Sequence, residues 1–207
     1  MMIELNFNEV HARVLATRSM QEQLQGDWTW TEATVADWNA SVTALTTARD
    51  AYADSLAAEG NARIDLKASA ASLHAENKLT LGIAKTDFRN APAKLGGFAG
   101  LQAVGASIPK TLATAQSISS AWQKADPAWT PVPGKTLAAY DALRSAVAGK
   151  QSALSSATAA VRQSNRALRA RLTTEDKKAK AWYAVATRVF PVGTPHGDAL
   201  RAAIRTA

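Results

Sequence analysis

Two long runs of apolar residues recur every seven positions, and this pattern restricts the fold more than any other feature of the sequence. The first run carries Trp38, Leu45, Tyr52, Leu66 and Leu73 at one heptad position, interrupted by Glu59. The second run carries Tyr140, Val147, Leu154, Val161 and Leu168 without a gap. A seven-residue apolar repeat forms a seam along one side of a helix, against which a second helix packs. The sequence therefore predicts two long helices, over about 31–88 and 136–190.

The composition favours an all-α fold. Alanine, the strongest helix former, occupies 46 of 207 positions, and the β-branched and aromatic runs typical of strands are missing. Shorter helical patterns cover 8–24 and 109–124, and a further one follows Pro191. Asn8 and Ser107 are the N-caps that we expect for the first two of these short helices.

We expect a single all-α domain over 1–207, an elongated bundle with coiled-coil-like long helices. The two long helices should pack antiparallel, because the segment 91–134 is long enough to return the chain. Glycine in "EGN" (59–61) and the weak capping box "TTED" (173–176) are points at which the long helices could end. The alternative fold is a compact bundle in which both long helices are broken there.

The two long patterns also resemble each other. Residues 38–88 align with 140–190 at a constant offset, with ten identities in 51 positions, of which seven pair alanine with alanine. Both patterns follow a Trp-Thr corner, and both end in a phenylalanine shortly before a proline. We interpret the likeness as an internal duplication with repeat units 28–90 and 127–192, connected by 91–126. The alternative is convergent composition in two alanine-rich helices.

The sequence lacks the residue constellations typical of enzymes. It contains no cysteine, which excludes disulfides and thiolate metal sites. No acidic residue lies three positions before His11, His74 or His196, so the Glu-x-x-His pairs of a di-metal bundle are absent. Asp50 and Asp54 lie one turn apart and fit a solvated helix face better than a catalytic acid pair. We therefore predict a non-enzymatic protein without cofactor, metal or small-molecule substrate.

The tryptophans suit packing better than ligand stacking. Trp38 and Trp182 lie within apolar helical patterns, and Trp38 aligns with Tyr140, so we expect all three rings in the core. Three more tryptophans fall in loops beside helix starts: Trp28, Trp30 and Trp129. Such rings commonly close the ends of helices.

Charge is unevenly distributed along the chain. The net charge of +7 divides into 9 basic and 12 acidic residues in 1–102, against 15 and 5 in 103–207. The most basic stretch carries Arg162, Arg166, Arg169, Arg171, Lys177, Lys178 and Lys180. The first three stand at i, i+4 and i+7, which is one side of a helix. This stripe suits nucleic acid, anionic lipid or an acidic protein surface, although a solvated face partly neutralised by the acidic first half is the simpler interpretation.

Nothing in the sequence indicates a membrane span or a secretory leader. The N-terminal residues lack a basic stretch followed by an apolar core, and the apolar segment 95–108 is short and contains four glycines. We expect a cytoplasmic protein, with leaderless export left open. Two long helices around an apolar tip resemble the layout of helical pore-forming toxins, which implies a membrane-active tip at 95–108. A buried turn between helices is the alternative.

Taken together, these patterns predict a structural or protein-interaction scaffold that binds a protein partner or self-assembles. The alternative function is nucleic-acid binding through the stripe at 162–180. Membrane activity is the third hypothesis.

Overall fold

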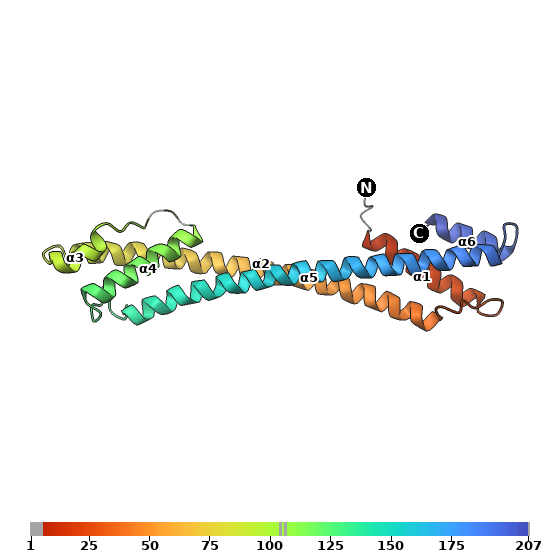
Figure 1. Cartoon of the computed structure of the whole chain (residues 1–207), viewed down its shortest axis with the longest axis horizontal. Helices are drawn as coiled ribbons and strands as arrows, with labels where there is room; N and C mark the ends of the chain where they lie inside the picture. Colours follow the sequence, from red (N-terminus) through yellow and green to blue (C-terminus); the bar gives the residue numbers. More distant parts are fainter. Residues whose placement is uncertain (1–5, 104, 106, 207) are drawn as a thin grey trace. The chain divides into compact units, whose positions relative to one another are not determined.

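The computed structural model describes residues 6–103, 105 and 107–206. Within this part of the chain the secondary structure is helical, without a strand (Figure 1). The helices are α1 (Phe7–Leu24), α2 (Val35–Asp87), α3 (Pro92–Ala99), α4 (Ile108–Ala125), α5 (Leu137–Val189) and α6 (Pro195–Thr206). The predicted all-α fold is confirmed.

Both long helices are continuous. α2 passes through 59–61, because Gly60 is exposed and a helix tolerates one glycine at a cost of about 1 kcal/mol. α5 passes through 173–176, where the Thr173 hydroxyl donates to the carbonyl of Arg169 one turn earlier instead of capping a new helix. The alternative with broken long helices is therefore wrong.

Two predicted helix starts need correction. α2 begins at Val35 rather than at 31, because Thr34 and Asp37 form a capping box: the Asp37 amide donates to the Thr34 hydroxyl, and the Thr34 amide donates to the Asp37 carboxylate at 2.7 Å. The bonds from the Thr34 amide and hydroxyl lower the pKa of Asp37. α1 is capped by Asn6, whose side chain accepts from the amide of Asn8, so Asn8 is not the cap itself.

Part of the segment that connects the predicted repeats is helical. It forms α3, which packs on α4, and Phe98 is completely buried there. Gly97 permits the close approach, because a Cβ at this position would lie 3.1 Å from the Cβ of Ala121. Of the predicted apolar tip at 95–108, Val104 and Ala106 lie outside the described residues.

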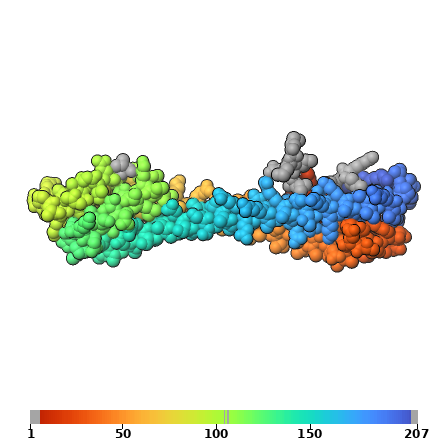
Figure 2. Space-filling model, viewed as in Figure 1, coloured from red at the N-terminus to blue at the C-terminus, as the bar shows by residue number. Residues whose placement is uncertain are grey.

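The chain divides into two compact units. Unit 1 is formed by residues 1–56 and 160–207, and unit 2 by residues 57–159. Each unit combines two short helices with one part of α2 and one part of α5, so neither unit coincides with one of the predicted repeats. In Figure 2, unit 1 carries the red, orange and blue surfaces, and unit 2 the gold, yellow-green, green and cyan ones.

Helix lengths and buried positions recur about one hundred residues apart along the chain. α1 and α4 each contain 18 residues and begin at 7 and 108, and α2 and α5 each contain 53 residues and begin at 35 and 137. Buried positions of α2 recur 102 residues later in α5 as the pairs Trp38/Tyr140, Leu45/Val147, Leu66/Leu168, Ala70/Leu172, Leu73/Glu175, Asn77/Ala179, Thr80/Trp182, Leu81/Tyr183 and Ala84/Ala186. The predicted inward positions of Trp38 and Tyr140 are confirmed.

Side-chain bonds connect the two long helices within each unit. In unit 1, Ser41 accepts from Lys178, and Ser55 bonds to Ser164 at 2.7 Å. In unit 2, Lys150 donates to Ser69 at 2.7 Å. Along α2 the partners are Ser41, Ser55 and Ser69. Their partners in α5 follow in the opposite order of residue number: Lys178, Ser164 and Lys150. Between 46 and 65 of α2 and between 148 and 167 of α5, no side chain is fully buried.

Candidate functional site

The predicted basic stripe lies on the C-terminal part of α5, in unit 1, and the structure divides it. Arg162, Arg166, Arg169, Lys177 and Lys180 are exposed. They stand at intervals of three, four or eight residues, which keeps them on one side of the helix.

Arg171 and Lys178 do not share that side of α5. Lys178 is half-buried, with its Nζ 3.2 Å from the Ser41 hydroxyl and 4.3 Å from the centre of the Trp38 ring. Arg171 forms an ion pair with Glu175, one turn later, at 3.2 Å. Lys178 therefore stabilises the contact between α5 and α2, whereas Arg171 is paired within α5. Neither belongs to the side of α5 that carries the other five cations.

Two buried carboxylates beside the stripe were not singled out from the sequence. The Glu175 and Asp176 side chains are only 4% and 7% exposed. Asp176 bonds to Arg13 of α1 and forms an ion pair with Lys180 at 2.7 Å. Burial of a carboxylate is tolerated only when cations or donors compensate its charge. For Asp176, α1 supplies Arg13 and α5 supplies Lys180.

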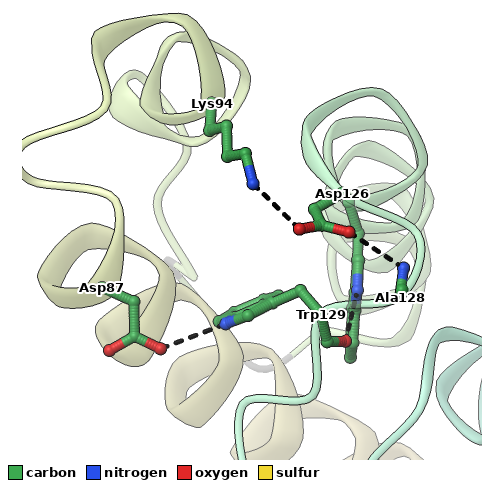
Figure 3. A network of polar contacts seen from close by, with 6 residues as sticks. Asp87, Lys94, Asp126, Ala128 and Trp129 are labelled. Atoms are coloured by element: carbon green, nitrogen blue, oxygen red, sulfur yellow. Dashed lines mark hydrogen bonds and ion pairs between the residues drawn. The ribbon is translucent and has the colours of Figure 1, made fainter.

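Unit 2 contains a polar network at the corner that follows α4 (Figure 3). Asp126 accepts from Lys94 of α3 at 2.9 Å and from the amide of Ala128 at 3.1 Å. The bond from Lys94, followed by that from Ala128, lowers the pKa of Asp126. The Trp129 indole donates to Asp87 at the end of α2, at 3.1 Å. The network therefore joins three helices around the edge of one ring.

The Trp129 ring fills the end of the unit 2 core. Its centroid lies 4.9 Å from that of Phe88 and 5.0 Å from that of Trp122. In unit 1, Trp28 packs similarly on Phe190, at 6.1 Å, and on Trp182, at 6.0 Å. Each ring thus covers the phenylalanine that follows a long helix, and the prediction that these tryptophans pack on helix ends is confirmed.

The histidines and the Asp50–Asp54 pair form no catalytic arrangement among the described residues. His196 lies in the first turn of α6. Its Nε2 lies 2.9 Å from Asp27 and its ring packs on Phe190, so it contacts the corner that follows α1. Asp50 forms an exposed ion pair with Arg49, and Asp54 is exposed. The described part of the chain contains no group of three or more potential metal ligands.

A buried hydrogen-bond chain crosses the core of unit 2. The Tyr140 hydroxyl donates to the Asn77 side-chain oxygen at 2.6 Å, and the Asn77 nitrogen donates to the carbonyl of Thr111 at 3.0 Å. Asn77 is completely buried. The chain connects α5, α2 and α4 and fixes their register, because any slip would leave a buried amide without partners.

Tyr140→Phe is expected to lower the free energy of unfolding by about 1–2 kcal/mol, because Asn77 would lose its donor while the ring remains. Urea denaturation measures this. Tyr52→Phe is the control, since the Tyr52 hydroxyl makes no hydrogen bond to a described residue. Equal stability of the Tyr140 variant and the wild type would contradict a contribution from the bond.

Tyr140→Phe should also change how the free energy of unfolding depends on pH in the alkaline range. Burial raises the pKa of Tyr140, whereas a tyrosine in the unfolded chain titrates near pH ~10. Above that pH the unfolded state loses a proton that the folded state retains, so Tyr140 reduces stability as the pH rises. Tyr140→Phe should therefore lose less stability than the wild type between about pH 9 and 11, measured by urea denaturation.

The surface of unit 1 has a shallow groove lined mainly by small side chains. α2 lines it with Ala40, Thr43, Ala44, Thr47, Ala48 and Ala51, and α5 with Ala167 and Arg171. No described helix combines the length and hydropathy that crossing a membrane requires.

Comparison with known proteins adds no relative. The sequence matches no protein-family model, and searches of curated proteins and of solved structures found no significant match.

Proposed function

We propose that this chain is a non-enzymatic helical scaffold, built by duplication of a unit of about one hundred residues, that binds protein surfaces and associates with itself. The recurrence of buried positions in α2 and α5 carries the proposal of duplication. Convergent composition would match alanines but has no reason to reproduce helix lengths, corner tryptophans and buried positions together. The opposite order of partners along α2 and α5 supports antiparallel packing.

Several buried polar side chains bond to other side chains of the same unit, which favours a scaffold over an enzyme. The buried carboxylate Asp176 is neutralised by Arg13 and Lys180, and the Trp38 indole donates to Gln21 at 2.9 Å. In unit 2, Tyr140 and Asn77 are bonded to each other. In an active site, by contrast, polar side chains converge on a cleft where they can contact a substrate.

Self-association is the form of scaffold function that the charge distribution supports. Residues 1–102 carry excess acid and residues 103–207 excess base. Asp54 and Asp65 of α2 are exposed, as are most of the basic residues of α5. Exposed charges of opposite sign allow two copies to attract each other at low ionic strength.

Light scattering coupled to size exclusion tests this proposal. At low salt and rising concentration, the mass should exceed the 21.9 kDa of one chain, and added salt should lower it because exposed charges are screened. A mass of 21.9 kDa at every concentration would contradict self-association.

Charge variants sharpen the experiment. Asp54→Lys, on an exposed acidic position, should reduce association. The double change Ala71→Lys and Ala75→Lys adds the same net charge at exposed neutral positions of α2 and serves as its control. If both proteins associate equally weakly, net repulsion rather than a specific acidic surface is responsible.

A further inference from the structure

We propose that one exposed side of α5 in unit 1 binds double-stranded nucleic acid through its phosphates, a function independent of the scaffold proposal. This surface, called the α5 basic face below, consists of Arg162, Arg166, Arg169, Lys177, Lys180 and Arg188. It differs from the stripe that the sequence predicts, because Arg171 and Lys178 are engaged elsewhere and Arg188 joins it.

The α5 basic face forms a regular row. Its six residues, together with Thr173 and Ala184, follow one another at steps of three or four residues, and all eight are exposed. Such steps stay on one side of a helix. At ~1.5 Å per residue, the row from Arg162 to Arg188 extends over about 39 Å. One turn of B-DNA is about 34–36 Å long, so a row of this length spans about one helical turn.

Little within α5 neutralises this row. The acidic residues of its 160–189 part are Glu175 and Asp176, and both are buried. Four cations make no ion pair with any described residue: Arg162, Arg166, Lys177 and Arg188. Lys180 does pair with Asp176, but Arg13 also bonds to that carboxylate, which offsets its charge. The row therefore keeps a strong positive potential toward solvent.

The fold itself does not require these cations. The positions 102 residues earlier in α2 are Gly60, Ile64, Lys67, Ala71, Ala75, Lys78, Gly82 and Thr86. This equivalent row carries two basic residues, whereas the α5 row carries six. A role in solubility or helix stability would apply to both helices, so the excess on α5 indicates a ligand of its own.

The chemistry of the row favours nucleic acid over an anionic membrane. The uncharged positions within it are Thr173 and Ala184, so no large apolar side chain lies in the row to enter a bilayer. Four of its six cations are arginines, whose guanidinium groups bind phosphate oxygens in pairs. The absence of aromatic residues from the row removes the stacking platform that single strands require, which leaves duplex phosphates as the ligand.

Fluorescence anisotropy with a labelled DNA duplex of about two helical turns tests the proposal. The wild type should bind at about 50 mM salt and lose affinity by about 10³-fold at 200 mM, as expected for six phosphate contacts. A variant with Arg162, Arg166, Lys177 and Arg188 changed to Gln should bind more weakly at 50 mM. The slope of log affinity against log salt should become shallower by about 3.6, since four contacts each contribute ~0.9.

A second variant controls for net charge. Lys67, Lys78, Lys110 and Lys124 are exposed residues of unit 2, and changing all four to Gln removes the same charge. This control should keep most of the affinity, and circular dichroism should show wild-type helix content in both proteins. The proposal is overturned if the wild type does not bind duplex DNA at about 50 mM salt, or if both variants weaken equally. It is equally overturned if vesicles of phosphatidylcholine and phosphatidylserine, or polyglutamate, bind the α5 basic face more tightly than the duplex does.

Discussion

Trp38→Ala is expected to lower the free energy of unfolding by about 3–5 kcal/mol, through lost transfer energy and the cavity left behind. The Trp38 side chain is completely buried in unit 1, and its ring stacks on Trp30 with 6.0 Å between centroids. Its indole also donates to Gln21 at 2.9 Å, and Lys178 lies over its face. The substitution would therefore leave a buried amide without its donor and a half-buried cation without its ring.

Urea denaturation monitored by circular dichroism measures this loss as a lower urea concentration at the midpoint of unfolding. Leu79→Ala is the control, because Leu79 is 44% exposed and its truncation should cost well under half as much. If the Trp38 variant is as stable as the wild type, then Trp38 is not a core residue and a surface for ligand stacking becomes the better explanation.

The long helices could be predicted from the sequence because the heptad pattern reports directly on packing. Their starts could not be predicted equally well, since a Thr-x-x-acid sequence is short and occurs at several places. Thr34–Asp37 caps α2, while Thr173–Asp176 has the same pattern inside α5. The difference is tertiary: the side chain of Asp176 faces Arg13 and Lys180 instead of a helix start.

α3 shows where local propensity gives the wrong prediction. Gly96 and Gly97 disfavour a helix, and their segment therefore predicts a flexible connection. In the folded chain, Gly97 lets the backbone approach Ala121 while Phe98 enters the core. Burial of the phenyl ring offsets the cost of ordering the glycines.

The residues of the candidate site could be predicted only in part from the sequence. The spacing of Arg162, Arg166 and Arg169 identifies one side of a helix. Continued at steps of three or four residues, the same spacing excludes Arg171 from that side and includes Arg188. The burial of Glu175 and Asp176 could not be inferred, because Arg13 is 163 positions away from Asp176 along the chain. Contacts between distant segments leave no local pattern in one sequence.

Trp122→Ala is also expected to cost about 3–5 kcal/mol, and its effect should be confined to unit 2. Trp122 is 1% exposed, its indole donates to the carbonyl of Trp129 at 3.0 Å, and its ring lies 5.8 Å from that of Tyr140. These partners all belong to unit 2. The middle parts of α2 and α5 bury no side chain fully, so they offer few contacts that could pass the loss to unit 1.

Native-state hydrogen exchange read by mass spectrometry locates the effect. In Trp122→Ala, amides of α4, of α2 near Leu81 and of α5 near Tyr140 should exchange faster, while α1 keeps its wild-type protection. Trp38→Ala provides the reciprocal control, because it should accelerate exchange in α1 and leave α4 unchanged. Equal acceleration of both units by either substitution would show that the whole chain unfolds as one cooperative structure. In that case the continuous helices α2 and α5, rather than the two cores, determine its cooperativity.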